Sequence, residues 1–321
     1  MTGTLKIAVP SKGRLKEQVE DYFFDSGIAI KRDGAARGYT GGQLKGVPGV
    51  DVVFLQAGEI PAALEAGSIH LGVTGQDLLR EKIANPDAVL QEILTLGFGY
   101  AKLVVAIPKS WIDVASMADL EDVAADMRTR SGRRMRVATK YITSTRAFFA
   151  RHGITDYRIV ESLGATEGAP NSGAAEIIVD ITSSGQTLKD NDLKILPDGV
   201  MLESYACLAG SFAADWSDDQ CRALRHILDM IGARAEAKTR KLIRFEGSDK
   251  AAEKIGTRLI ADFDCLKGTV PQTVYAPHKQ IYAITQELRA AGFGTVSAAD
   301  VEYLFTDPNP LYEGFVGALN R

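Results

Sequence analysis

Short apolar runs rich in β-branched residues alternate with stretches of three-to-four-residue apolar periodicity through the first two-thirds of the chain. The runs predict strands and the periodic stretches predict helices. The predicted strands are Leu5–Val9, Val52–Leu55, Ile69–Val73, Leu103–Ile107, Met135–Ala138 and Glu176–Ile181, and the helices include Arg14–Ser26, Ser116–Thr129 and Thr143–His152. Nearly continuous runs such as LVVAI and EIIVDI are typical of strands buried on both faces. We therefore expect an α/β fold with helices on both faces of a sheet.

The pattern changes after Gly210, where helical periodicity dominates. A long helix with a basic end near Arg240 is predicted from apolar residues at i, i+3, i+4 and i+7, which are Leu224, Ile227, Leu228 and Ile231. Two further helices are predicted at Ser248–Ile260 and His278–Ala291, with the segment GTVPQTVYAP between them. The end of the chain therefore reads as an appended α+β module.

Two segments rich in glycine or polar residues, Leu96–Pro108 and Thr182–Gly199, mark the places where the chain passes between units. We expect two lobes with a cleft between them. The predicted parts are lobe I at 1–98, lobe II at 99–182, a return to lobe I with a linking helix at 183–230, and a regulatory or oligomerisation module at 231–321.

Composition narrows the class of protein. The chain has 321 residues, 45% hydrophobic and 24% charged, which is typical of a globular protein with a sizeable core. Its 37 basic and 41 acidic residues give a net charge of −4, which is unlike the overall basic charge of a nucleic-acid-binding protein. The sequence has neither an apolar run of roughly 18 residues nor a signal-peptide pattern. We expect a cytoplasmic protein with no nucleic-acid or membrane partner.

Cysteine and histidine give no sign of metal or nucleophile chemistry. The three cysteines are widely spaced and form no CxxC pair, which disfavours a disulfide framework or a structural zinc site. The four histidines are far apart in sequence, and none lies beside a serine or cysteine in a nucleophile motif. We predict no metal ligand from the protein.

The segment Gly164–Asn191 holds the clearest candidate site. Its predicted strand ends in Asp180, and a loop of small polar residues follows at once: Thr182, Ser183, Ser184, Gly185, Gln186 and Thr187. Inward backbone N–H groups, hydroxyls and a helix start suit a monophosphate. Glu176 and Asp180 are four residues apart on one strand face, which favours hydrogen bonds to vicinal hydroxyls of a sugar. The structural alternative is an ordinary capped connection between strand and helix.

Cations follow two other predicted strands. Lys12, Gly13 and Arg14 lie between the first strand and its helix, where two cations suit a polyphosphate. The helix macrodipole disfavours positive charge at this position, so an anionic ligand is favoured over two solvated cations. The turn lacks the GxxxxGK[ST] pattern of nucleoside triphosphatases. Lys140 follows the strand Met135–Ala138, from which it either reaches an anion across the cleft or is solvated.

Together these segments closely resemble the ATP phosphoribosyltransferase family. The resemblance covers roughly Leu5 to Gly210 and rests on IAVPSKGRL, LGVTGQDLL, LGFGYAKLVVAIP, RVATKY with TRAFF, and the run Gly164–Leu188. In that run the family spacing is matched by the SSGQTL loop and by Glu167, Pro170, Gly173, Glu176 and Asp180.

The resemblance implies two α/β lobes like those of type II periplasmic ligand-binding proteins, with the active site in the cleft. It implies that N1 of the ATP adenine displaces pyrophosphate from C1 of phosphoribosyl pyrophosphate (PRPP), with Mg²⁺, to give phosphoribosyl-ATP in the first step of L-histidine biosynthesis. By resemblance, the segment from Asp180 to Thr187 binds the 5-phosphate of PRPP, and Glu176 and Asp180 act near the ribose. By the same resemblance, Lys12 and Arg14 lie toward ATP or pyrophosphate. We predict that Gly13 and Lys140 bind the same groups.

The C-terminal segment does not decide which of the family's two forms this chain resembles. The long form ends in a module that binds histidine as a feedback inhibitor, whereas the short form relies on a regulatory subunit resembling histidyl-tRNA synthetase. This chain is longer than a short form, and Arg240–Arg321 is either such a module or an unrelated addition. The resemblance implies a homo-oligomer, either a dimer or a hexamer, or a heteromer with that subunit.

Two alternative functions remain at this point. Another PRPP-dependent phosphoribosyltransferase usually has two adjacent acids before its loop, whereas this chain has Val179 and Asp180. A two-lobed small-molecule binding protein without catalysis normally carries an export signal, which this sequence does not show.

Overall fold

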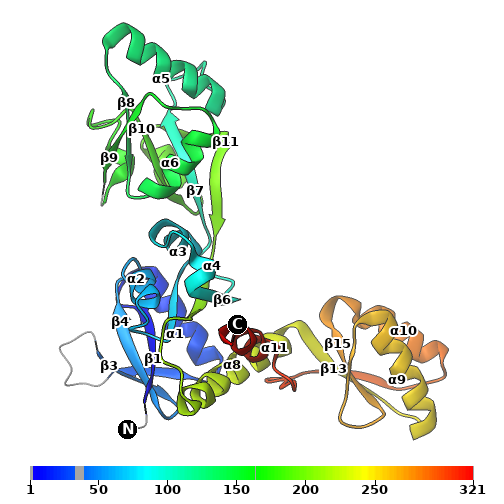
Figure 1. The fold of residues 1–321 in the computed structure, drawn as a ribbon. Helices are drawn as coiled ribbons and strands as arrows, with labels where there is room; N and C mark the ends of the chain where they lie inside the picture. Colours follow the sequence, from blue (N-terminus) through cyan, green and yellow to red (C-terminus); the bar gives the residue numbers. More distant parts are fainter. Residues whose placement is uncertain (1–2, 33–39, 163, 321) are drawn as a thin grey trace.

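The computed structural model describes residues 3–32, 40–162 and 164–320, which fold into three α/β bodies (Figure 1). A seven-stranded sheet of order β2-β3-β4-β1-β5-β12-β6 forms lobe I, and a five-stranded sheet of order β11-β7-β10-β8-β9 forms lobe II. A four-stranded sheet of order β14-β15-β13-β16 forms the C-terminal module. Figure 1 shows lobe I between the other two bodies. The two-lobed α/β fold with an appended module is confirmed.

Lobe I has parallel strands at its centre. β1 (Leu5–Pro10) lies between β4 (Val50–Leu55) and β5 (Leu71–Gly75), and both neighbours are parallel to it. β12 (Ala206–Ser211) is antiparallel to β5 and to β6 (Leu90–Thr95). The hairpin of β2 (Ala29–Arg32) and β3 (Thr40–Lys45) forms the other edge. The helices are α1 (Gly13–Asp25), α2 (Ile60–Glu65), α3 (Gln76–Lys82) and α4 (Pro86–Val89).

Both faces of this sheet are buried. On one face, Ile7 and Val9 of β1 pack with Phe23 of α1. On the other face, Ala8 packs with Ile60 of α2. The alternation of side chains along β1 therefore supplies two cores from one strand.

Lobe II is built around β10 (Ile177–Thr182). It pairs antiparallel with β7 (Ala101–Pro108) and parallel with β8 (Met135–Thr139), which pairs parallel with β9 (Tyr157–Glu161). The outer strand β11 (Leu193–Ser204) is antiparallel to β7. The helical segments are α5 (Met117–Ser131), α6 (Ile142–Arg151), η1 (Thr166–Gly168) and α7 (Gln186–Asp190).

The chain crosses between the lobes twice. The first crossing joins β6 to β7, and the second joins β11 to β12 through Tyr205. The crossings touch, because Ala206 N donates to the Phe98 carbonyl at 3.0 Å and the rings of Tyr100 and Tyr205 lie 5.0 Å apart. The expected return to lobe I at residue 183 differs from the structure. β11 stays in lobe II because it forms a ladder with β7, so the return occurs at Ala206.

The module also begins later than residue 231. α8 (Asp218–Thr239) is one continuous helix, and β13 (Arg240–Phe245) starts the third sheet directly after it. The module continues through α9 (Asp249–Phe263), β14 (Leu266–Lys267), β15 (Thr273–Pro277), η2 (His278–Gln280), α10 (Ile281–Ala290) and β16 (Val296–Asp300). These helices cover the two that the sequence predicted.

The last helix, α11 (Pro310–Leu319), leaves the module and packs on lobe I against α8 and β6. Phe315 is fully buried in the core of lobe I. A Cβ at Gly210 would lie 2.4 Å from the Phe315 ring, so only glycine at this point of β12 leaves room for it. The module is therefore joined to lobe I at both of its ends. In the described part of the chain, we find no helix with the length and apolar character that crossing a membrane requires.

Candidate functional site

The loop after β10 has a fixed turn geometry. Gly185 adopts a left-handed φ of 75°, and its N–H donates to Thr182 Oγ1 at 2.8 Å. Ser184 Oγ accepts from Gln186 N at 3.3 Å, where α7 begins. Ser183 Oγ donates to the carbonyl of Tyr100 at 2.9 Å. The loop is thus folded by its own hydroxyls and is attached to the first crossing between the lobes.

Asp180 is half-buried in β10, two residues before this loop. Burial raises the pKa of its carboxyl, while the Ile181 N–H and the Lys140 ammonium oppose that rise. The charge of Glu167 adds to the rise in pKa, and a hydrogen bond from the Thr166 hydroxyl lowers it. Lys140 and Glu167 therefore both lie close enough to act on Asp180. The structure brings Lys140 to Asp180 and adds Glu167, which the motif contains but to which the sequence analysis gave no role.

Glu176 lies immediately before β10, at the end of the strand opposite to Asp180. It forms an ion pair with Arg136, with Nη2 and Oε1 2.6 Å apart, and it accepts from Arg136 N at 2.6 Å. Four residues of a strand span about 13 Å, so Glu176 and Asp180 do not reach the vicinal hydroxyls of one sugar. This spacing and the Arg136 ion pair argue against the predicted action of both carboxylates on one sugar, although the i, i+4 spacing does put both on one face. Glu167 takes the place beside Asp180 because η1 follows β9, whose carboxyl end adjoins that of β8.

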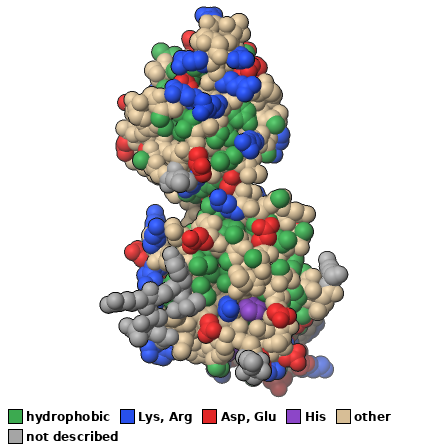
Figure 2. Space-filling model, turned by 60° about the vertical axis from the view of Figure 1, so that its left-hand side comes forward, with side chains coloured by type: hydrophobic (Ala, Val, Ile, Leu, Met, Phe, Trp, Pro, Cys, Tyr) green, Lys and Arg blue, Asp and Glu red, His purple; other side chains and the backbone are tan. Residues whose placement is uncertain are grey.

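The sheet registers place these groups on the edge of lobe II that faces lobe I. β8 and β10 end at this edge, and β7 begins there. The first crossing enters lobe II through β7, and the second leaves through the end of β11, which pairs with the start of β7. Since both crossings meet this edge, the loop after β10 and Lys140 lie toward lobe I. Figure 2 shows that the molecule is narrowest between the two lobes.

The predicted cations of lobe I lie on its matching edge. Lys12, Gly13 and Arg14 follow the carboxyl end of β1 and are exposed. Ala206, where the second crossing enters lobe I, pairs with Gly75 at the carboxyl end of β5, on the same edge. Gly13 has a left-handed φ of 77°, and a Cβ there would meet no atom within 4 Å. The two predicted groups therefore stand on facing edges of separate lobes.

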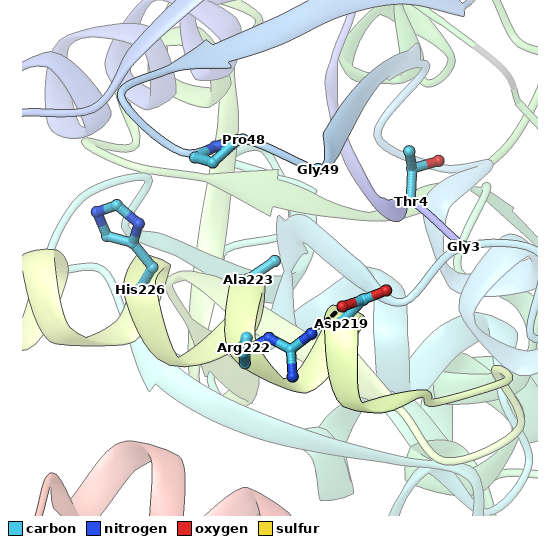
Figure 3. Close-up of a pocket in the computed structure, with 8 residues that line it drawn as sticks. All are labelled: Gly3, Thr4, Pro48, Gly49, Asp219, Arg222, Ala223 and His226. Carbon is cyan, nitrogen blue, oxygen red and sulfur yellow. Dashed lines mark hydrogen bonds and ion pairs between the residues drawn. The ribbon is translucent and has the colours of Figure 1, made fainter. Parts of the chain in front are cut away.

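A separate hollow of about 400 Å³ lies at the opposite edge of lobe I (Figure 3). Gly3 and Thr4 before β1, and Pro48 and Gly49 before β4, line one side of it. The other side is α8, with the Asp219–Arg222 ion pair and the His226 ring. None of the predicted site residues lines this hollow.

Among the described residues, no group of three or more His, Cys, Asp or Glu side chains is placed to hold a metal ion.

The family model and the curated relatives that match this chain belong to the same family. The family model HisG, described as ATP phosphoribosyltransferase, matches residues 56–232. The ATP phosphoribosyltransferase of Rhodopseudomonas palustris (strain HaA2) is 48% identical over 328 residues, which cover 100% of both chains. That of Bradyrhizobium sp. (strain ORS 278) is 49% identical over 319 residues, which cover 97% of each. The C-terminal module is therefore shared with these relatives, and it is not an unrelated addition.

Among solved structures, the chain is similar to one from the ATP phosphoribosyl transferase (HisG:HisZ) complex of Thermotoga maritima. The TM-score is 0.54 at 24% identity, and the match covers 71% of this chain and 96% of that one. At this identity the match supports the two-lobed fold alone. The rest of this chain lies outside the match.

Proposed function

Because this chain belongs to the ATP phosphoribosyltransferase family, we propose that its reaction takes place between the two lobes, at the edge where β10 ends. The enzyme is a pentosyltransferase that joins the ribose C1 of PRPP to N1 of the ATP adenine and releases pyrophosphate. This step opens L-histidine biosynthesis. The proposal rests on one observation above all: both chain crossings meet the sheet edges that carry Asp180, the 182–187 loop, Lys12 and Arg14.

The 5-phosphate of PRPP binds in the loop from Thr182 to Thr187. A phosphate dianion needs donors, and the hydrogen bonds within the loop determine which hydroxyl protons are free. The Ser183 hydroxyl donates its proton to the Tyr100 carbonyl. The hydroxyls of Thr182 and Ser184 act as acceptors within the loop, so their protons remain free to bind the phosphate. Thr187 is exposed on the first turn of α7. We therefore assign the main phosphate contacts to Ser184 and Thr187, with Thr182 beside them, Gly185 shaping the turn and Gln186 starting the helix.

The ribose lies beside Asp180 and Glu167. Displacement at an anomeric carbon passes through a transition state with positive charge on the sugar ring, and fixed carboxylates stabilise such charge. A covalent nucleophile is not needed, because two bound substrates held in line supply most of the advantage. The Lys140 ammonium lies near the Asp180 carboxylate, where it binds the phosphates of the substrates. Glu176 has no part in this step, since it is held by Arg136 at the far end of β10.

The anionic end of ATP or the departing pyrophosphate meets Lys12, Gly13 and Arg14 on lobe I. Two exposed cations at the start of α1 oppose the helix dipole, and an anion bound there removes the conflict. Mg²⁺ neutralises pyrophosphate charge when bound. Mg²⁺ prefers oxygen ligands and keeps several waters, so the carboxylates of Asp180 and Glu167 suit it beside oxygens of the substrate.

We assign a regulatory role to the C-terminal module. The full-length relatives share it, and part of this chain lies outside the match to the Thermotoga chain. We therefore favour a homo-oligomer, a dimer or a hexamer, in which the module responds to L-histidine, over a heteromer with a separate regulatory subunit.

One assay tests these statements. The full chain is mixed with ATP, PRPP and Mg²⁺, and the ultraviolet absorbance of phosphoribosyl-ATP is followed. Product from the chain alone shows that no separate subunit is required, and product only after a regulatory subunit is added contradicts the homo-oligomer. Inhibition by free L-histidine supports a regulatory module, and an unchanged rate at high histidine contradicts it.

A further inference from the structure

Two buried carboxylates on lobe I bind lobe II. Asp77 and Glu81 lie one turn apart on α3, and each is only 7% exposed. Their acceptor atoms are occupied mainly by groups of the other lobe. Carboxylates are rarely this deeply buried unless they are fully paired, so this contact is specific.

Glu81 caps a helix that belongs to the other lobe. Its Oε1 accepts from Thr143 N at 2.8 Å, and its Oε2 accepts from Ser144 N at 2.9 Å and from Ser144 Oγ at 2.7 Å. These are first-turn N–H groups of α6, which have no acceptor within their own helix. Such groups are usually capped by a side chain just before the helix, but Tyr141 at the cap position makes no side-chain cap. The first turn of α6 is thus completed by lobe I.

Asp77 holds two more parts of lobe II. Its Oδ2 accepts from the hydroxyl of Tyr141 at 2.7 Å, and its Oδ1 accepts from Ser204 Oγ at 2.8 Å. Ser204 is the last residue of β11, directly before the second crossing. Tyr141 is 1% exposed, so its hydroxyl depends on this partner.

The contact between the α3 carboxylates and lobe II adjoins the proposed site. Lys140 immediately precedes Tyr141, and its ammonium acts on Asp180. The charge of Asp180 in turn acts on the Tyr141 hydroxyl, whose pKa is raised first by burial and then by Asp77. The Lys140–Tyr141 turn therefore lies between the α3 carboxylates and the carboxylate of the site.

We propose that Asp77 and Glu81 are positioning residues that set the angle between the lobes and hold the Lys140–Tyr141 turn at Asp180. This inference rests on the proposed function, because it requires that the substrates bind between the lobes. Neither carboxylate needs to touch a substrate. A cap of purely structural value would change the stability of the protein and leave the kinetics of the folded enzyme unaltered.

The test compares variants of the full-length chain. Glu81→Leu keeps the volume and removes every acceptor, whereas Glu81→Gln keeps one acceptor oxygen. Thr143→Ala is the matched control, because the Thr143 side chain is exposed and its backbone N–H remains. We expect Glu81→Leu to reduce kcat/KM for both substrates by about 100-fold, the cost typical of misplaced reacting groups, with a smaller loss in Glu81→Gln and none in the control.

A second readout locates the change. Hydrogen exchange at the Thr143 and Ser144 amides should become faster in both Glu81 variants, while exchange in β8 and β10 stays as in the wild type. If Glu81→Leu does not fold, Glu81→Gln carries the test. Wild-type kcat and KM for both substrates in the folded variants would overturn the positioning role. Asp180→Asn separates this result from the proposed site: if it impairs turnover and the Glu81 variants do not, only the positioning role is wrong.

Discussion

Arg136 and Glu176 form a two-point ion pair at the start of β10, with the guanidinium Nη2 2.6 Å from the carboxylate Oε1 and Nε 3.1 Å from Oε2. The carboxylate also accepts from the backbone of Arg136. A residue in the middle of the run Gly164–Leu188 thus joins two strands of lobe II, and Arg136 occupies its carboxylate.

This arrangement gives a prediction for Glu176. Glu176→Gln should destabilise the protein by about 1–3 kcal/mol, because it weakens charged hydrogen bonds to a half-buried guanidinium. The kcat and KM of the folded enzyme should stay within a factor of about two, since Glu176 lies about 13 Å along the strand from Asp180. Urea unfolding and steady-state kinetics on the same preparation check both parts. A large fall in kcat at unchanged stability would return Glu176 to the active site.

The loop gives a prediction about individual hydroxyls. Thr187→Ala and Ser184→Ala should each raise the KM for PRPP by about 10-fold or more, because each removes a donor to a charged phosphate. Ser183→Ala should raise that KM less, since its proton is donated to Tyr100. The KM for ATP should change little in all three variants. Equal effects at all three positions would show that the hydrogen bonds within the loop do not select the phosphate ligands.

A pH prediction follows from His70, which is buried in lobe I. Nδ1 accepts from Lys6 N at 3.0 Å and Nε2 lies 3.1 Å from the Asp215 carbonyl, so the neutral ring carries its proton on Nε2. Burial lowers the pKa of His70 below its ordinary value of 6.5, and the Lys6 charge adds to that effect. The folded state therefore binds this proton less readily than the unfolded state does, and the histidine's contribution to stability is fully present above pH 6.5.

That contribution should be lost as the pH falls from 6.5 through the lower pKa of the folded state. Thermal unfolding between pH 5 and pH 8 checks this, with His70→Gln as the control that cannot titrate. The wild type should lose melting temperature toward pH 5 more steeply than the variant does. Parallel curves for the two proteins would show that another group causes the acid sensitivity.

Much of the fold could be predicted because local pattern and final structure agree. The expected strand Leu103–Ile107 lies within β7, and the expected periodicity from Leu224 to Ile231 lies on the buried face of α8. β11 could not be predicted, because its Pro-Asp-Gly sequence reads as a turn. In the structure, these residues form an irregularity in the pairing of β11 with β7. β11 is an outer strand, where proline and bulges are tolerated.

The candidate site could be assembled from the sequence only where its residues are contiguous in the chain. Asp180 and its loop are contiguous, so the sequence shows them together. The charge of Glu167 acts on Asp180 from η1, and Glu176 pairs with Arg136 on another strand. Both pairs depend on which strands are neighbours in the sheet, and no local pattern contains that information. The capping of α6 by Glu81 depends on contact between lobes and is equally hidden.

Replacement of Asp180 tests the central claim, that the edge of lobe II at the end of β10 binds PRPP and acts on its ribose. Asp180→Asn keeps the size of the side chain and removes the charge beside the developing cation. We predict that its kcat with ATP, PRPP and Mg²⁺ falls by about 100-fold or more, the loss typical of one removed electrostatic contact to a transition state, or that its KM for PRPP rises by a similar factor. Wild-type values of both kcat and KM for PRPP in the folded Asp180→Asn enzyme would contradict the account.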